Sequence, residues 1–214
     1  MVINMKEQGW IDISQPLTSD IGTWPGDTKF SYQLSYEKEE TGSVNIGQFT
    51  TSVHTGTHAD APFHFDNEGK KINELDVNSY IGRARVVDVT GNEKIGAREL
   101  ENFQLDGITR LLLRTVNRNV PTVFPMNFTV LDENIGPYLK EKGIFLIGTD
   151  VPSVDPVDSK GVSAHHSLYK SNVHILENLM LADVEPGDYE LIALPLAIVG
   201  ADGSPVRAVI RPIK

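Results

Sequence analysis

Short stretches in which apolar and polar side chains alternate recur along the chain, and this period of two predicts β-strands. Two further stretches contain consecutive apolar residues, which is typical of strands that are buried on both faces of a sheet: residues 109–115, with three leucines in a row, and residues 143–149, GIFLIGT. The other predicted strands are residues 10–14, 30–36, 44–53, 83–90, 173–177, 189–198 and 205–211.

Helical patterns are fewer and shorter. They predict helices at residues 96–103, 131–142 and 163–170, the last with Ser163 as its N-cap. Residues 116–128 contain two prolines and several asparagines and are predicted to form a loop. We therefore expect an α/β protein, a single domain over residues 1–214, with a mixed β-sheet core and short helices packed on it. The pattern does not determine the order of the strands.

Composition narrows the function classes. The chain has 214 residues, enough for one domain with a substantial core. Its formal net charge is −10 and no basic run occurs, which argues against a nucleic-acid partner and against an anionic membrane surface. No apolar run approaches the roughly 20 residues of a membrane span. The first ten residues, MVINMKEQGW, lack the apolar region of a secretory signal.

The sequence contains no cysteine. Structural zinc sites built on cysteine and thiol nucleophiles are therefore excluded, and any metal must be bound by histidine and carboxylate side chains. A chain without cysteine also fits the reducing conditions of the cytoplasm, which is the location we expect.

Residues 54–65, HTGTHADAPFHF, hold three of the six histidines together with one aspartate. Side chains alternate between the two faces of an extended chain, so an extended segment would place four polar residues on one face. These are His54, His58, Asp60 and His64. A zinc-protease helix also spaces two histidines by four residues. Gly56, Pro62 and the β-branched threonines disfavour a helix here, so we expect the end of a strand that runs into a loop.

The distance between two of these histidines raises a geometric question. A straight strand would separate the Cα atoms of His54 and His58 by roughly 13 Å, at about 3.3 Å per residue. Two imidazoles on a single ion barely span that gap. Either the chain bends at Gly56 around one ion, or two ions lie side by side with Asp60 reaching both.

Further candidate ligands lie in the second half of the chain. His165 and His166 are adjacent and would point about 100° apart on a helix, so only one of them can face a given ion. Glu177 ends the apolar run VHILE, and a buried glutamate needs a partner such as a cation. A solitary histidine such as His174 is more often a structural residue than a ligand.

Trp24 precedes the turn-forming pair Pro25-Gly26 and therefore lies on a constrained loop. Two interpretations stand. The indole either caps the core or forms an aromatic wall for a flat substrate, because an aromatic ring adds stacking to its area burial.

The string HTGTHADAPFHF resembles the signature of the metal-dependent cyclase family, His-x-Gly-Thr-His-x-Asp-x-Pro-x-His. Every fixed position matches: His54, Gly56, Thr57, His58, Asp60, Pro62 and His64. The similarity runs nearly from end to end and includes residues 10–14, 24–27, 147–153, 164–166, 175–177 and 202–207.

This resemblance implies a fold of the swivelling β/β/α type and a homodimer. It also implies a binuclear metal centre, usually with two Zn²⁺ ions per subunit. The implied ligands are His54, His58, Asp60, His165 and Glu177. Asp60 and Glu177 would be shared between the ions, His64 would transfer a proton without binding metal, and Trp24 would line the substrate pocket.

The implied activity is hydrolysis of a small-molecule substrate, N-formyl-L-kynurenine, to L-kynurenine and formate in tryptophan degradation. The alternative is a related hydrolase of this family that acts on another small aryl amide or on a lactam of the isatin type. A third interpretation, a metal-binding module without activity, is disfavoured because the ligand set leaves open positions on the metal. The sequence has no Gly-x-Ser-x-Gly elbow, which argues against the serine-based route to the same reaction.

Overall fold

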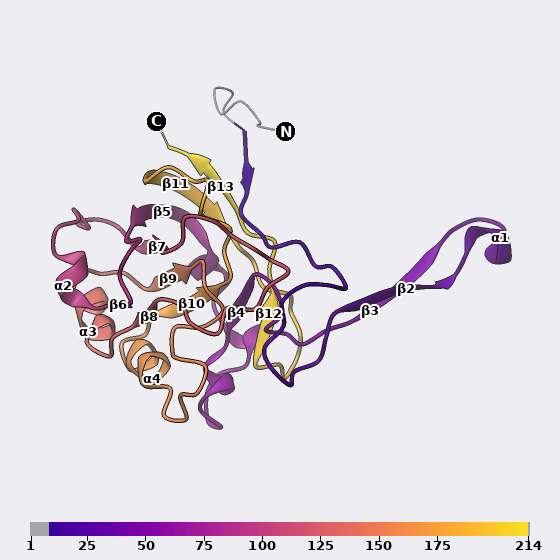
Figure 1. Ribbon diagram of the computed structural model, residues 1–214, viewed down its shortest axis with the longest axis horizontal. Helices are drawn as coiled ribbons and strands as arrows, with labels where there is room; N and C mark the ends of the chain where they lie inside the picture. Colours follow the sequence, from indigo (N-terminus) through magenta and orange to yellow (C-terminus); the bar gives the residue numbers. More distant parts are fainter. Residues whose placement is uncertain (1–8, 214) are drawn as a thin grey trace.

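The computed structural model describes residues 9–213 (Figure 1). Their main sheet has nine strands. In spatial order these are β1 (Ile11–Asp12), β13 (Val209–Pro212), β11 (Gly187–Ile192), β5 (Ile81–Asp88), β7 (Arg110–Arg114), β9 (Leu146–Thr149), β10 (His174–Glu177), β4 (His58–Asp60) and β12 (Gly203–Pro205). The strands from β5 to β10 run parallel, and the other pairs are antiparallel. This mixed sheet confirms the predicted fold class. The first eight residues, part of the segment expected to lack a secretory signal, lie outside the described range.

Short helices cover one face of this sheet (Figure 1). They are α2 (Ala97–Leu100), α3 (Ile135–Glu141) and α4 (Ser163–Lys170), accompanied by the small strands β6 (Lys94–Ile95) and β8 (Val130–Leu131). The 3₁₀ turns η1 (Pro62–His64), η2 (Ile72–Glu74) and η3 (Val77–Tyr80) connect β4 to β5. Within residues 9–213, no helix combines the length and the apolar character that crossing a bilayer requires.

The apolar runs of the sequence form the central strands, and both of their faces are buried. Leu112 packs in the cluster on one face of the sheet, whereas Leu111 and Leu113 pack in the other cluster with α3 and α4. All three leucines have no exposed surface. The prediction from the consecutive leucines is therefore confirmed, because a strand covered on both faces selects apolar residues at every position.

The last two predicted strands have different bounds in the structure. The predicted strand 189–198 ends at Ile192, and residues 205–211 contribute to two strands rather than one. β12 is the last strand at one end of the sheet, and β13 is the second strand from the other end. Only three residues separate these two strands in the chain. So short a connection spans about 14 Å at most, and the sheet must therefore curl until its two ends approach each other.

The start of α4 also differs from the prediction. Ser163 is the first helical residue, and the N-cap position is Val162, which has no capping hydrogen bond and a left-handed φ of 35°. Instead, the carboxylate of Asp155 accepts hydrogen bonds from the backbone N–H groups of Ala164 and His165. A distant aspartate thus takes over the capping function that was expected of Ser163.

A separate hairpin extends from the body as an arm (Figure 1). It consists of β2 (Ser31–Tyr36) and β3 (Ile46–Thr50), with the single-turn helix α1 (Lys38–Thr41) at its tip. Both strands were predicted, although the predicted range 44–53 is longer than β3. Neither strand joins the main sheet. The hydrogen bond from Ser52 N–H to Thr28 O closes the root of the arm.

Candidate active site

The histidine-rich stretch reaches the site through a bend at Gly56. This residue has a φ of +69°, a left-handed conformation that favours glycine, and a Cβ atom there would lie 2.7 Å from Leu17 Cδ2. The bend predicted at Gly56 is confirmed, although the bend alone does not distinguish one ion from two. Only residues 58–60 are extended, however, so the expectation of one continuous strand face is wrong for His54 and His64. These two residues lie on a turn before β4 and on η1 after it.

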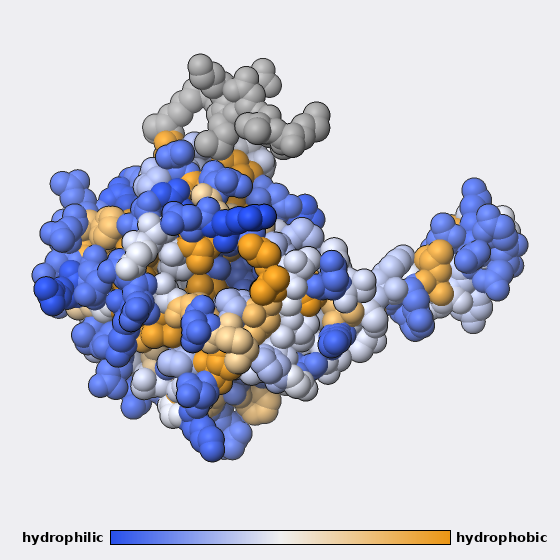
Figure 2. All heavy atoms as spheres, in the orientation of Figure 1, coloured by the Kyte–Doolittle hydropathy of each residue, from blue (hydrophilic) through white to orange (hydrophobic). Residues whose placement is uncertain are grey.

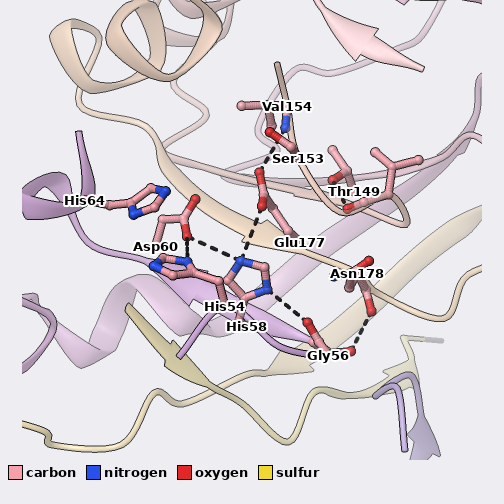
Figure 3. A network of polar contacts seen from close by, with 12 residues as sticks. His54, Gly56, His58, Asp60, His64, Thr149, Ser153, Val154, Glu177 and Asn178 are labelled. Carbon is pink, nitrogen blue, oxygen red and sulfur yellow. Dashed lines mark hydrogen bonds and ion pairs between the residues drawn. The ribbon is translucent and has the colours of Figure 1, made fainter. Parts of the chain in front are cut away.

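The first group of contacts joins three residues of this stretch (Figure 3). His54 Nδ1 lies 2.9 Å from Asp60 Oδ1, and His58 Nε2 lies 3.4 Å from the same oxygen. His58 Nδ1 donates to Gly56 O at 2.9 Å. Because a carbonyl oxygen only accepts, this hydrogen bond leaves Nε2 of His58 directed at the carboxylates.

Glu177 comes from the neighbouring strand. In the antiparallel pair β10–β4 it stands directly opposite His58, and its Oε2 lies 3.3 Å from His58 Nε2. Its other oxygen, Oε1, accepts a hydrogen bond from Val154 N–H at 2.9 Å (Figure 3). The sequence-based expectation that Glu177 is a buried carboxylate with partners is confirmed, since the residue is only 3% exposed.

His165 completes the cluster from α4. Its Nδ1 donates to Asp155 Oδ2 at 2.7 Å, which leaves Nε2 3.4 Å from Asp60 Oδ2 and 3.8 Å from Glu177 Oε1. The ring of His166 instead meets the edge of Phe65, with ring centroids 5.7 Å apart. The structure therefore brings His165, not His166, to the carboxylates.

The cluster fits a bound cation by one specific observation. Asp60 Oδ2 is buried, and its 3.4 Å contact with His165 Nε2 does not have hydrogen-bond geometry, so this oxygen has no hydrogen-bond partner among the described residues. A buried carboxylate oxygen without a donor costs free energy unless a cation compensates it. Two sets of three residues could each hold a metal ion, because within each set the potential ligand atoms lie within 4.8 Å of one another. Asp60 belongs to both sets. The sets are His58, Asp60 and Glu177, and His54, Asp60 and His64. Mixed imidazole and carboxylate donors suit a divalent metal such as zinc.

The charges of the cluster shift its titration. Burial opposes the charge on His58, but the hydrogen bonds with Asp60 and Glu177 outweigh it and raise its pKa to about 10. The pKa of His165 is also raised to about 10, and that of His54 to about 9, because hydrogen bonds with aspartates again outweigh the effect of burial. Protons therefore occupy the imidazoles when no cation is bound, and a metal must displace them.

His64 behaves differently from the other three histidines. It lies nearer to solvent, with 38% of its side chain exposed, and partial burial lowers its pKa. Its Nδ1 is 3.4 Å from Asp202 Oδ2, a longer contact than those of His54. A histidine that is neutral near pH 7 can accept a proton, so His64 has the properties of a proton-transfer group.

A pocket with a volume of about 210 Å³ opens onto the cluster. Trp24 and Phe124 line it together with His54, His58, His64, His165 and Glu177. The two aromatic rings meet edge to face, with centroids 5.3 Å apart. The structure therefore places Trp24 in the wall of the pocket, as in the second of the two interpretations of its loop.

Sequence reasoning missed two aspartates of the site. Asp202 Oδ2 accepts a hydrogen bond from His54 Nε2 at 2.9 Å and also faces His64. Asp155 orients His165 and caps its helix. In the sequence Asp155 directly precedes Pro156, and Asp202 lies three residues before Pro205. Their contacts are formed by tertiary structure, and no local spacing could have indicated them.

Buried imidazoles and carboxylates that converge on one pocket define a hydrolase-type enzyme site that can hold a divalent metal. The Cyclase family model matches residues 11–156. A kynurenine formamidase from a strain of Bacillus cereus is 63% identical, over 98% of this chain and 100% of that protein. A kynurenine formamidase from Bacillus anthracis is 61% identical with the same coverage of both chains. The chain therefore belongs to the Cyclase family, in which these curated relatives are kynurenine formamidases.

Solved structures show the same fold. A potential metal-dependent hydrolase with cyclase activity superimposes with a TM-score of 0.81 and 26% identity, covering 96% of this chain and 98% of the other. Isatin hydrolase A from Labrenzia aggregata superimposes with a TM-score of 0.82 and 21% identity, covering 96% and 94%. At this lower identity, the likeness to isatin hydrolase concerns the fold alone.

Proposed function

We propose that this protein is an arylformamidase that hydrolyses N-formyl-L-kynurenine to L-kynurenine and formate in tryptophan degradation. The observation that carries the proposal is the 61–63% identity, over nearly the whole chain, to relatives named for this activity. The aromatic wall beside the histidine–carboxylate cluster supports it, because the substrate is an aryl amide. No specific observation favours the lactam alternative.

We propose two Zn²⁺ ions per subunit, held by the five residues that the family resemblance implies. These are His54, His58, Asp60, His165 and Glu177. Support comes from how the carboxylates divide their oxygens. Asp60 directs Oδ1 toward His54 and His58 and Oδ2 toward His165, while Glu177 directs Oε2 toward His58 and Oε1 toward His165. Carboxylates shared in this way can serve two ions. When bound, zinc lowers the pKa of a water to about 7 and polarises a carbonyl oxygen.

His64 is proposed as the proton-transfer residue. Its contact with Asp202 occupies Nδ1, which leaves Nε2 free to face the pocket that His64 lines. It takes a proton from the attacking water as the water oxygen bonds to the formyl carbon. It then returns that proton to the aniline nitrogen as the carbon–nitrogen bond breaks, so that formate and the free amine leave.

Trp24 is proposed to hold the aryl group of the substrate. An aromatic ring stacked on the indole would gain roughly 0.5–1.5 kcal/mol beyond its area burial. Phe124 meets the indole edge-on and holds it in position. The scissile formamide would then lie in the pocket that this wall shares with the histidines.

Three features of the organisation complete the proposal. We propose that residues 1–214 act as one domain, which the pairing of β1 with β13 near the two ends of the chain supports. We also propose a homodimer and a cytoplasmic location. The absence of cysteine from the sequence is compatible with that location.

Metal analysis of the purified protein, combined with assays on two substrates, tests these assignments. We expect about two equivalents of zinc per chain and release of formate from N-formyl-L-kynurenine, lost on chelation and restored by zinc. Isatin, as the matched cyclic aryl amide, should be turned over far more slowly. Faster hydrolysis of isatin would contradict the substrate assignment, and full activity without metal would contradict the mechanism.

A further inference from the structure

The turn that carries Trp24 also places a carboxylate in the pocket. Residues 24–27 form a β-turn in which Asp27 N–H donates to Trp24 O at 3.0 Å. Pro25 and Gly26, the latter with a φ of +87°, occupy the two central positions, which is typical of a type II turn. The first and fourth Cα atoms of a β-turn lie within about 7 Å of each other. Trp24 and Asp27 both line the pocket, so the indole and the carboxylate belong to the same part of its wall.

The carboxylate of Asp27 has no other role in the described part of the chain. Its Oδ1 accepts a hydrogen bond from the N–H of the next residue, Thr28, at 2.6 Å, and no basic side chain within residues 9–213 forms an ion pair with it. Hydrophilic residues are spread over the visible surface of the body (Figure 2), so exposure alone does not distinguish Asp27. Its position in the lining of the pocket does.

The charges of the lining have one sign outside the histidines. Among the described residues, the lining includes carboxylates but neither lysine nor arginine. Asp155 and Glu177 are committed to the cluster through their contacts with His165 and His58. Of the carboxylates that line the pocket in residues 9–213, only Asp27 stands outside this cluster. A ligand that reaches the turn therefore meets a negative charge and no cationic side chain.

A second feature of the lining also favours a ligand that donates hydrogen bonds. Gln15 lines the pocket, and its Oε1 atom is buried and has no hydrogen-bond partner among the described residues. A buried acceptor without a donor costs free energy, so it needs a ligand or a water molecule that donates to it. Gln15 and Asp27 thus give the pocket free acceptors. An ammonium group matches them, because it has three donors and no acceptor.

We propose that Asp27 determines specificity for the amino-acid end of the substrate by binding its α-ammonium group, an inference that rests on the proposed function. In N-formyl-L-kynurenine three carbon atoms separate the aryl ring from the ammonium nitrogen, a length similar to the span of one β-turn. An aryl group held on Trp24 thus brings the ammonium beside Asp27, where the N–H···O hydrogen bonds are charge-assisted. The α-carboxylate, which finds no lysine or arginine in the described lining, is directed toward solvent.

Hydrolysis of a matched pair of substrates tests this role. N-formyl-L-kynurenine is compared with its deamino analogue, which keeps the aryl formamide and the carboxylate but lacks the ammonium group. In Asp27→Asn, whose amide oxygen can still accept from Thr28, KM for N-formyl-L-kynurenine should rise roughly 5- to 20-fold at nearly constant kcat, because a charge-assisted hydrogen bond at an exposed carboxylate is lost. KM for the deamino analogue should not rise.

Asp20→Asn is the matched control. Asp20 is an exposed carboxylate on the same loop between β1 and β2, and it does not line the pocket. The substitution removes the same charge near the same turn, so it reports any effect that comes from net charge rather than from contact. We expect Asp20→Asn to behave as wild type with both substrates.

Ionic strength gives an independent measurement. Because Asp27 is exposed, its attraction for the ammonium group should be screened by salt. KM of the wild-type protein for N-formyl-L-kynurenine should therefore rise between about 0.05 M and 0.5 M sodium chloride. KM of Asp27→Asn should change little over the same range.

The possible outcomes separate this inference from the proposed function. An equal loss of kcat/KM for both substrates in Asp27→Asn would show that the side chain only maintains the turn, and would overturn the inference. An unchanged KM for N-formyl-L-kynurenine, or an equal effect of Asp20→Asn, would overturn it as well. In each of these cases the wild-type protein still releases formate, so the proposed function stands. Failure of the wild-type protein to hydrolyse N-formyl-L-kynurenine would refute that function and this inference with it.

Discussion

Replacing His64 with alanine should separate metal binding from proton transfer. A positioned acid–base residue contributes roughly 10²- to 10⁴-fold to a rate. At about 1.4 kcal/mol per tenfold, this corresponds to about 3–5 kcal/mol of transition-state stabilisation. We therefore expect kcat for N-formyl-L-kynurenine to fall by this factor, with a small change in KM, because the Trp24 wall is untouched.

The contacts of His64 predict that neither the fold nor the metal is lost in this variant. Asp202 keeps its 2.9 Å hydrogen bond with His54 when His64 is removed, so no buried charge is left without a partner. The His64–Asp202 contact joins two side chains that are 38% and 41% exposed, and such pairs contribute at most about 1 kcal/mol to the free energy of unfolding. His58 and Glu177 remain 3.3 Å apart within the sheet.

The assay combines steady-state kinetics with metal analysis by mass spectrometry on the same preparations. His166→Ala is the matched control, since its ring packs on Phe65 and His166 does not line the pocket. The control should retain activity and metal. If His64→Ala loses metal along with activity, His64 is a ligand and the assignment is wrong. That outcome is a genuine test, because His64 lies within 4.8 Å of ligand atoms of His54 and Asp60.

Three further predictions concern the carboxylates and the pH dependence. Asp202→Asn removes the charge that faces His54 and His64, and should lower kcat roughly 10- to 100-fold; kinetics at constant metal content measure this. Asp155→Asn weakens the orientation of His165, and should reduce metal affinity roughly 10- to 100-fold in competition with a chelating dye. In the metal-free protein, the pKa of His54 rises from 6.5 to about 9 and that of His165 to about 10. The stabilisation that the two protonated histidines contribute is complete below pH 6.5 and is lost as the pH rises through their folded-state pKa values. The thermal midpoint of the metal-free protein should therefore decrease as the pH is raised from 6.5 to about 9.5, and bound zinc should suppress this decrease.

Local patterns in the sequence predicted what local forces determine. The consecutive apolar residues of β7 and β9 identified central strands, because burial on both faces favours apolar side chains at successive positions. His58, Asp60 and the bend at Gly56 were readable because they lie within a few residues of one another. Choosing His165 over His166 required the family resemblance, since spacing on a helix shows only that the two point apart.

The remaining features depend on contacts between distant segments. Asp202 lies 148 residues from His54, and its role follows from the curl of the sheet that brings β12 beside β4. Strand order has the same origin and was not predictable from periodicity. The alternation of residues 30–36 correctly indicated a strand, yet the same pattern fits a sheet of the body and a projecting arm. What distinguishes the two is whether further strands pair with the segment, which the alternation of one segment does not specify.

The placement of the site residues explains why the donors can be rigid while the substrate side is adaptable. His58 and Glu177 are direct partners in the antiparallel pair β10–β4, so the ladder itself keeps their Cα atoms about 5 Å apart. Asp60 is on the same short strand as His58 and is also held by β12. By contrast, Trp24 lies on a loop between the body and the arm, where few backbone hydrogen bonds fix it. The geometry of the donors is therefore set by the sheet, whereas the aromatic wall is set by contacts between loops, such as the edge-to-face pair of Trp24 and Phe124. It follows that Phe124→Ala should keep its metal and weaken the binding of the aryl substrate, measured as a higher KM at unchanged metal content.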